Sequence, residues 1–294
     1  MKAEPSPGTE AKQLRHYQSL LFPFAYNITG DLMASEDIVQ EVITHHMTRP
    51  VEHVENPEGY LVRSVVNKAI NQKKLLRNRM EQYPGHWLPS PVLTEESMYK
   101  GADRDSIIHY SLLVLMERLN AKERAVFILK ETFDYVHEEI ADILKITVDH
   151  SRQLLKRGKE KISIPKASTS SQREESKILL SQLADAIKSA DLEKAKKLLS
   201  DDVSCIADGG PNISATRNVL EGPDHVSKLL KAIYGKYFPE NATSSFAIVN
   251  HMPALVFKLN SSVFRCVIFE IEANIIQKIF VMVNPDKLKK IDLF

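Results

Sequence analysis

Cationic and hydrogen-bonding side chains gather in the stretch that follows Thr147. They are His150, Arg152, Gln153, Lys156 and Arg157. Arg and Lys neutralise phosphates, and Arg and Gln also hydrogen-bond the edges of bases in the major groove of DNA. The chemistry expected of this set is therefore recognition of DNA. A solvated basic face on an ordinary helix is the alternative interpretation of these residues taken alone.

The elements before this set read as the first two helices of a helix-turn-helix. Asn120 with Glu123 three positions later is typical of a helix N-cap, and that helix is expected to end near Phe133. A second, short helix is predicted from His137 to Leu144. In a helix-turn-helix the last helix enters the major groove, so this context favours DNA binding.

The helix that carries the cationic set is expected to begin after Thr147, which can cap it. One face is predicted to pack, and it is formed by Val148, Ser151, Leu155 and Ile162. The cations then fall on the opposite face. The junction before this helix carries Lys145 where Gly is frequent, because the backbone there often needs a positive φ.

Charge is distributed in blocks along the 294 residues, although the formal net charge is only +1. From Asp31 to Glu58 acids dominate, with Arg49 as the single Lys or Arg, whereas the segment from Tyr60 to Met80 contains cations and no acid. Adjacent blocks of opposite sign indicate two partners, one basic and one polyanionic. The length allows two or three domains, each with its own core.

The acidic block contains a predicted helix that begins at Ser35, after a loose tail over residues 1–12 and a first helix from Leu14 to Asn27 that Pro23 kinks or breaks. Its outer face carries Asp37, Gln40 and Glu41. A merely solvated face is the alternative for these three. The segment from His45 to Asn56 is predicted to be a loop.

The basic block reads as a long helix that Pro57 opens at its first position. One face carries Arg63, Asn67, Asn71 and Lys74 at helical spacing. Arg and Asn read base edges and Lys binds phosphates, so this face is a second candidate for nucleic acid, with an ordinary soluble surface as the alternative.

A proline-rich linker follows from Tyr83 to Pro91 and holds the only Trp of the chain, Trp87. Proline on both sides predicts an extended course. Trp87 is interpreted either as a docking anchor or as a ring that packs against the nearest helix. An apolar helix is expected from Ile107 to Leu119, and a second linker from Pro165 to Gln172.

The remainder of the chain predicts an α+β cone with one cavity. Helices are expected around Leu179 to Ile187, after Asp191, and from Pro223 to about Tyr237. Four antiparallel strands follow, over Phe246–Val249, Ala254–Leu259, Val263–Glu272 and Ile275–Val283. The candidates for a general base here are Asp208, His225 and His251, but a turn or solvent accounts for each, and no acid and base are paired at informative spacing.

Several stretches resemble the extracytoplasmic-function sigma factors of the sigma-70 family. Region 2 of these proteins is similar to three stretches, Ala25–Gly30, Ser35–Glu41 and Asn56–Leu61, and region 4 resembles the helix-turn-helix around Glu139–Ala141. The resemblance implies that Asp37, Gln40 and Glu41 dock on core RNA polymerase. It implies that the face with Arg63, Asn67, Asn71 and Lys74 binds the promoter −10 element, and that the helix after Thr147 reads the −35 element.

The linker and the C-terminal part resemble a subgroup of these sigma factors with a fused SnoaL-like domain of the NTF2-like fold. The similar stretches are Trp87-Leu88-Pro89-Ser90-Pro91, with Ser90 where the subgroup has Glu, Asp208-Gly209-Gly210, Asn250–Ala254, and Asn284-Pro285-Asp286-Lys287-Leu288. By this resemblance, Trp87, Leu88 and Pro89 act together with the first and last of those C-terminal stretches in an interdomain regulatory contact.

The expected organisation is a multidomain chain with two all-α domains and one α+β domain. Its parts are a flexible tail at 1–12, region 2 at 13–82, the Trp-containing linker at 83–105, region 4 at 106–165, a linker at 166–173 and the SnoaL-like domain at 174–294. The expected partners are core polymerase and promoter DNA, with no separate anti-sigma protein, and a small-molecule ligand in the C-terminal cavity is left open.

The sequence predicts a reduced, cytoplasmic protein with no metal, cofactor or membrane partner. Cys205 and Cys266 lie far apart, no apolar run reaches spanning length, and the N-terminus is polar. The predicted function is that of a sigma factor and not of an enzyme. Two alternatives remain, a ligand-sensing DNA-binding regulator that never joins polymerase, and an isomerase or cyclase fused to a DNA-binding module.

Overall fold

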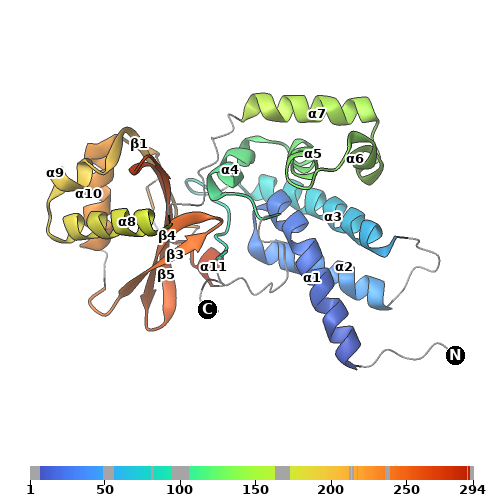
Figure 1. The fold of residues 1–294 in the computed structure, drawn as a ribbon, viewed down its shortest axis with the longest axis horizontal. Coiled ribbons are helices and arrows are strands. Elements are labelled where there is room, and N and C mark those ends of the chain that lie inside the picture. The colour runs from blue at the N-terminus through green and yellow to red at the C-terminus, as the bar shows by residue number, and fades with distance from the viewer. Residues whose placement is uncertain are drawn as a thin grey trace. The chain divides into compact units, whose positions relative to one another are not determined.

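The computed structural model describes residues 7–48, 56–80, 83–94, 106–162, 173–211, 213, 215–216, 218–235, 239–289 and 291. The second predicted linker, Pro165 to Gln172, lies outside them. The chain divides into two compact units (Figure 1). Unit 1 comprises Met1–Glu81 and Ser97–Ile164, and unit 2 comprises Gln82–Glu96 and Pro165–Phe294. The Trp-containing linker therefore belongs to the same compact unit as the C-terminal part of the chain.

Unit 1 begins with three helices, α1 (Pro7–Thr29), α2 (Leu32–Thr48) and α3 (Pro57–Met80). The prediction of a loose tail up to residue 12 is wrong from Pro7 onward, and α1 runs through Pro23 without a break. Buried Leu21, Phe22 and Ala25 pack around this position. Their burial compensates for the backbone hydrogen bond that a proline removes from a helix.

The start of α2 differs from the prediction at Ser35. Asp31 caps the helix instead, because its Oδ1 accepts a hydrogen bond from Ala34 N at 2.9 Å. Ser35 lies one turn inside, buried, where its hydroxyl meets Thr29 Oγ1 at 2.7 Å. The helix also continues to Thr48 and takes in the first part of the predicted loop. At α3 the prediction holds: Pro57 is its first residue, and Asn56 Oδ1 accepts from Gly59 N.

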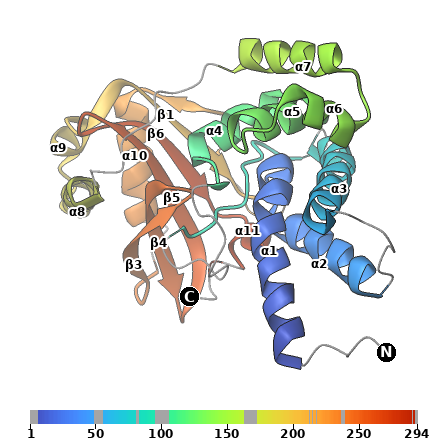
Figure 2. The same cartoon turned by 45° about the vertical axis from the view of Figure 1, so that its right-hand side comes forward.

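The second half of unit 1 contains α4 (Tyr110–Leu115), the 3₁₀ turn η2 (Met116–Arg118), α5 (Ala121–Glu131), α6 (His137–Leu144) and α7 (Val148–Lys161). The apolar helix expected from Ile107 is thus shorter and ends in a 3₁₀ turn. Asn120 and Glu123 form the predicted capping box, and Thr147 Oγ1 caps α7 through His150 N. Figures 1 and 2 show α7 along the outer side of α5 in both views.

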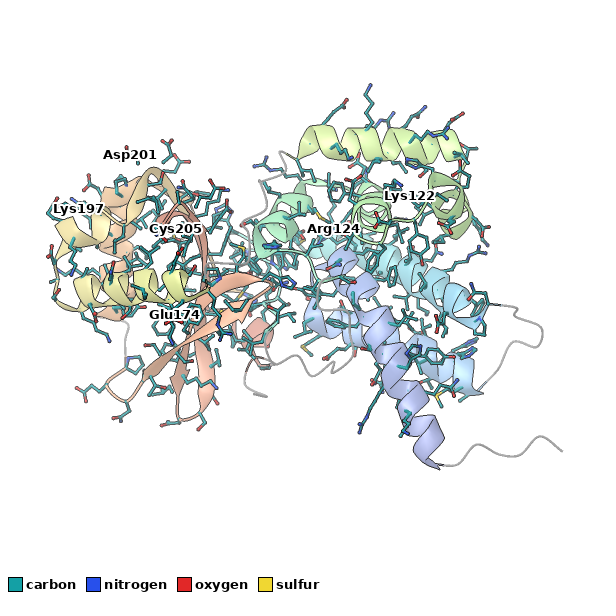
Figure 3. All side chains as sticks on the ribbon, viewed as in Figure 1. Lys122, Arg124, Glu174, Lys197, Asp201 and Cys205 are labelled. Carbon is teal, nitrogen blue, oxygen red and sulfur yellow. The ribbon has the colours of Figure 1, made fainter. Side chains whose placement is uncertain are left out.

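A buried ionic cluster ties the two halves of unit 1 together. The Glu117 carboxylate binds Lys73 Nζ of α3 at 2.6 Å and pairs with the guanidinium of Arg124 of α5. Arg124 Nε also donates to the Asn27 carbonyl of α1 at 2.8 Å, among the packed helices (Figure 3). Burial alone would raise the pKa of Glu117, but the two cations outweigh it and lower that pKa.

Unit 2 contains a six-stranded sheet with the order β2-β1-β6-β5-β4-β3. The strands are β1 (Leu199–Asp208), β2 (Leu220–Glu221), β3 (Thr243–Val249), β4 (Met252–Leu259), β5 (Ser262–Glu272) and β6 (Ile275–Met282). The sequence predicted the last four and missed β1, whose first half is polar, and the two-residue β2. Because β1 pairs with β6 in parallel, the sheet is mixed and not purely antiparallel.

The helices of unit 2 are α8 (Arg173–Lys188), α9 (Leu192–Lys196), α10 (Pro223–Tyr234) and α11 (Pro285–Leu288). In both views α8 and α10 lie on one face of the sheet. That face contributes Cys205, Ala207, Val267 and Val281 to one apolar cluster together with Leu183 of α8 and other helix residues. Asp208 follows Ala207 in β1, so its side chain points to the opposite face.

Gly158 offers a test of the packing of α7. It lies buried inside the helix, where an added Cβ would meet the Glu123 carbonyl and a Leu119 methyl at 3.9 Å, which is ordinary contact. Gly158→Ala is therefore expected to raise the free energy of unfolding by about 1 kcal/mol, through helix propensity. Gly222→Ala is the control with the opposite sign, because Gly222 has φ +81°. Chemical denaturation of both variants checks the prediction, and a destabilised Gly158→Ala would contradict it.

Candidate functional site

The outer face of α7 presents the predicted DNA-binding side chains. Ser151, Leu154 and Gly158 form its buried side, so Leu154 and not Leu155 is the most deeply packed leucine. Gln153, Lys156 and Arg157 are exposed and form no ion pair with any residue the structure describes. Arg152 is exposed and pairs with Glu138 and Asp149, and His150 is half-buried. This face can therefore offer three free polar side chains to a groove.

The turn before α7 adopts the positive φ that is typical of a helix-turn-helix junction, although Lys145 and not Gly occupies the position. Lys145 adopts φ 52° and ψ 54°, the left-handed conformation at the C-terminus of α6. A lysine is strained there by about 1–2 kcal/mol. Ile146 N donates to the Ala141 carbonyl at 3.0 Å and closes the turn. The tight junction of a helix-turn-helix is thus made without glycine.

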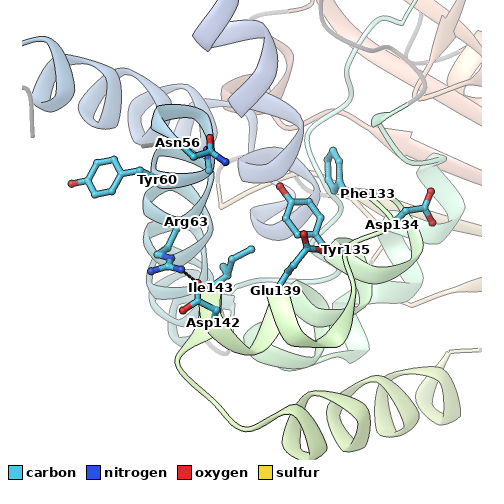
Figure 4. Close-up of a pocket in the computed structure, with 10 residues that line it drawn as sticks. Asn56, Tyr60, Arg63, Phe133, Asp134, Tyr135, Glu139, Asp142 and Ile143 are labelled. Atoms are coloured by element: carbon cyan, nitrogen blue, oxygen red, sulfur yellow. Dashed lines mark hydrogen bonds and ion pairs between the residues drawn. The ribbon is translucent and has the colours of Figure 1, made fainter. Parts of the chain in front are cut away.

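Only half of the predicted polar face of α3 is open in this structure. Asn71 and Lys74 are exposed. Arg63 pairs with Asp142 of α6 (Figure 4). Asn67 Nδ2 donates to the Ile143 carbonyl at 3.0 Å and to the Arg63 carbonyl at 2.8 Å. The four predicted residues share one helix face, but α6 occupies its N-terminal part.

An open cavity of about 940 Å³ lies beside this contact. One side is lined by Tyr60 and Arg63 of α3 and by Asn56, which directly precedes that helix (Figure 4). The other side carries an acidic and aromatic set, formed by Phe133, Asp134, Tyr135, Glu139 and Asp142. The acids and the N-terminal end of α3 thus face each other across the opening.

The predicted polymerase-docking residues lie together on the exposed face of α2. Asp37 and Gln40 are exposed and make no ion pair among the described residues, whereas Glu41 binds Lys68 Nζ at 2.6 Å. Met33 and Met47 are exposed on the same helix. The face is therefore acidic, with apolar side chains near both ends.

Asp208 is the centre of the most connected polar site in the described part of unit 2. It is fully buried at the end of β1. Its Oδ1 accepts from the Tyr83 hydroxyl at 2.5 Å and from Gly210 N at 2.9 Å, and its Oδ2 accepts from Leu88 N at 2.8 Å. Two of these three donors belong to the linker.

Lys287 of α11 completes the charge balance of this site. Its ammonium binds Asp208 Oδ2 at 2.7 Å and the Leu88 carbonyl at 2.5 Å. It also lies 4.0 Å from the centroid of the Trp87 ring and 5.4 Å from that of Tyr83, which is cation–π geometry. We call Asp208, Asn284 and Lys287, together with Tyr83, Trp87 and Leu88, the linker clamp.

The C-terminal end of the linker segment is also bound to the β3–β4 turn. Val92 N donates to Asn250 Oδ1 at 3.0 Å, and Asn250 N donates back to the Val92 carbonyl at 2.9 Å. Leu93 forms an isolated antiparallel bridge with Val249, at the end of β3. The segment from Tyr83 to Thr94 is therefore fixed at both ends on unit 2.

The other residues of the two C-terminal stretches shape the clamp. A Cβ on Gly209 would lie 2.1 Å from the Ile213 carbonyl, and Gly210 has φ +68° and lies against the Asn284 side chain. Asn284 caps α11 through Asp286 N and donates Nδ2 to the Tyr83 hydroxyl at 2.8 Å. Pro285 is the first residue of α11, and Leu288 is buried. Pro89 of the linker is buried as well.

Two residues that hold the linker, Tyr83 in the clamp and Asn250 at Val92, were not predicted as site residues. Both lay in stretches that the sequence singled out, but their roles depend on partners more than a hundred positions away. Burial and the hydrogen bond to Asp208 raise the pKa of the Tyr83 phenol, so this group stays a donor. A residue whose partner is so remote gives no local signal.

The candidates for catalysis are not brought together. Asp208 is bound by the linker and Lys287 and faces away from the cluster under α8 and α10. His225 Nδ1 lies 3.0 Å from the Glu221 carbonyl at the surface, and His251 lies in the turn between β3 and β4. The described residues contain no group of His, Cys, Asp and Glu that could hold a metal. Burial raises the pKa of both cysteine thiols to about 12.

Comparison with known proteins identifies the family of the chain. The model of sigma-70 region 2 matches residues 14–79, and that of sigma-70 region 4 matches residues 109–162. The chain belongs to the extracytoplasmic-function branch of the sigma-70 family. In sigma-factor terms, α1–α3 form region 2 and α4–α7 form region 4. No helix in the part of the chain that the structure describes is long and apolar enough to cross a membrane.

Relatives of this sigma factor occur in Mycobacterium tuberculosis. A probable ECF RNA polymerase sigma factor, SigI, is 26% identical over 280 residues, which is 93% of each chain. The ECF RNA polymerase sigma factor SigJ is 25% identical over 236 residues, 78% of this chain and 75% of SigJ. The crystal structure of SigJ matches with a TM-score of 0.71 and 20% identity over 94% of this chain and 97% of that one. The fold is thus shared over nearly the whole length, including the C-terminal NTF2-like domain.

The linker clamp is tested by Asp208→Asn. This change leaves the Lys287 ammonium buried without its counter-ion, which costs about 3–5 kcal/mol for such a pair. We expect the linker to detach, and Trp87, as the only Trp, to report it by a red-shifted fluorescence emission. Circular dichroism checks that the sheet is intact.

Asp202→Asn is the matched control, since Asp202 is exposed on the same strand. It is expected to leave the emission of Trp87 unchanged. An unshifted emission in Asp208→Asn, in a chain that remains folded, would contradict the role given to the carboxylate.

Proposed function

We propose that this sigma factor binds core RNA polymerase through α2 and promoter DNA through α3 and α7, while its C-terminal domain controls the linker between regions 2 and 4. The single observation that carries the proposal is the linker clamp, in which a buried carboxylate and a buried ammonium hold Leu88 by its N–H and its carbonyl. Both hydrogen bonds go to charged groups, the stronger class of hydrogen bond.

The distance between the two promoter elements explains how the clamp could regulate promoter binding. The −10 and −35 elements lie about 25 base pairs apart by their names, roughly 85 Å of DNA at 3.4 Å per base pair. In the free chain α3 and α6 are in contact, so regions 2 and 4 have to separate before both elements are bound. The segment that must allow this separation is the linker. Docking of Tyr83–Thr94 on the C-terminal domain fixes its course and so limits the separations that the chain can adopt.

The linker between Met80 and Tyr110 is long enough for this role. A segment of about 30 residues spans roughly 100 Å when fully extended. A linker released from the clamp therefore permits the promoter-bound spacing, and a clamped one restricts it. The C-terminal domain takes the place of a separate anti-sigma protein in this proposal, because it is already covalently joined to the segment that it controls.

The polymerase contact is assigned to the exposed acids of α2. Asp37→Arg is expected to weaken binding to bare core polymerase by tenfold or more, because like charges at an interface cost several kcal/mol. Glu174→Arg, at an exposed site on α8, is the control and should bind as the parent does. Co-purification at low ionic strength measures the difference. No association of the parent chain with core would defeat the proposal and favour a regulator that never joins polymerase.

The promoter contact is assigned to the open face of α7. Lys156→Ala in the holoenzyme is expected to weaken binding of all promoter variants alike and to lower the slope of log affinity against log salt by about 0.9, the value for one phosphate contact. Gln153→Ala should relax discrimination at one base pair. The probe is a promoter fragment found by run-off transcription from genomic DNA with core enzyme. Lys177→Ala, at an exposed site on α8, is the control. An unchanged slope in Lys156→Ala would rule out the assignment.

We propose no catalytic activity and no cofactor for the C-terminal domain. The NTF2-like fold also includes enzymes, but here the buried carboxylate serves the clamp. A small-molecule ligand in the C-terminal cavity stays a prediction. Action on polymerase and promoter DNA would place the protein in the cytoplasm, as predicted.

A further inference from the structure

The contact between α3 and α6 involves the same atoms that the proposed promoter contact requires. Arg63 offers its guanidinium to the carboxylate of Asp142 (Figure 4). Asn67 offers its amide N–H to the carbonyl of Ile143. Both partners belong to the last turn of α6, which ends at Leu144. We call these four residues the α3–α6 contact.

The end of α6 resembles a nucleic-acid strand in its chemistry. A guanidinium binds carboxylate and phosphate with the same forked geometry. An asparagine amide that donates to a peptide carbonyl can equally donate to an acceptor on a base edge. The last turn of a helix also carries free carbonyls and the negative end of the helix dipole. Asp142 and the Ile143 carbonyl thus present an anion and an acceptor, side by side, to α3.

Both N–H groups of the Asn67 amide are already used in this contact. Asn67 is half-buried and already donates to carbonyls of both helices. Asn71 and Lys74, further along the same face, are exposed and remain available. The α3–α6 contact therefore covers the N-terminal half of the face and leaves the C-terminal half open.

Other contacts hold α6 in this place. The rings of Phe24 in α1 and Phe133, in the turn before α6, stack with centroids 3.8 Å apart. The buried Glu117 cluster joins α3 to α5 by its pairs with Lys73 and Arg124. The α3–α6 contact is thus presented by a packed scaffold and not by a loose surface encounter.

We propose that the end of α6 is an internal competitor of the promoter −10 strand: Asp142 and the Ile143 carbonyl occupy Arg63 and Asn67 until DNA displaces them. The inference rests on the proposed function, since it takes Arg63 as a DNA contact. It adds that region 4 masks part of region 2 in the free chain, independently of the linker clamp. Because the Arg63–Asp142 pair is largely exposed, with 38% and 70% of the two side chains accessible, the competition is modest.

The test compares Asp142→Asn with Asp149→Asn in the full-length chain. Both remove one exposed acid from region 4, but among the residues that the structure describes Asp149 pairs with Arg152 of its own helix and not with α3. The probe is a fluorescent, mixed-sequence single-stranded 20-mer DNA at low salt. We expect Asp142→Asn to bind it about two- to fivefold more tightly than Asp149→Asn does, the factor that one exposed ion pair supplies. In an Arg63→Ala background this difference is expected to vanish.

The outcomes separate the inference from the proposed function. Equal affinities of Asp142→Asn and Asp149→Asn would overturn the competition and leave the promoter assignment standing. A gain that persists without Arg63 would also overturn it, because the gain would then be general electrostatics. If Arg63→Ala fails to weaken binding in the Asp142→Asn background, Arg63 is not a DNA contact, and both the inference and the −10 assignment fall.

Discussion

A lysine ammonium and an aspartate carboxylate buried beside each other are the constraint on which the rest of this structure depends. Neither Lys287 nor Asp208 could stay charged in such a place alone, because desolvation of an isolated ion costs several kcal/mol. Their remaining hydrogen-bonding capacity is satisfied by linker atoms, Leu88 among them. The pair is therefore completed only when the linker is docked, which couples the C-terminal domain to a segment far away in sequence.

Unit 1 uses the same device for a different purpose. Glu117 is buried between Lys73 and Arg124, and these cations come from α3 and α5. The cluster holds the two halves of the sigma core in a packed state, while the outer face of α7 stays open. A sigma factor needs its promoter-binding regions folded but not permanently joined. Charged groups suit such a joint, since water and phosphates can replace their partners when the halves separate.

Local signals in the sequence were sufficient for the elements whose causes are local. The capping box of Asn120, the cap at Thr147 and Pro57 at the start of α3 each depend on a few neighbouring residues, and the structure confirms all three. Ser35 was misjudged as a cap because its sequence context fits one, whereas Asp31 takes that role and Ser35 is buried against Thr29. Strand β1 was missed because its polar first half has little strand propensity and its pairing partner β6 lies some seventy residues away.

The sequence by itself determined the family, the helix-turn-helix, the helical faces that carry Asp37, Arg63 and Lys156, and the importance of the stretches around Trp87, Asp208 and Lys287. It did so because periodicity, capping and motif are written in neighbouring positions. Only the tertiary structure decided what those side chains contact: that Asp208 faces the linker and not a cavity, and that Arg63 is held by α6. Such contacts join positions dozens to hundreds of residues apart, and the packing of the whole unit, not the local chain, selects them.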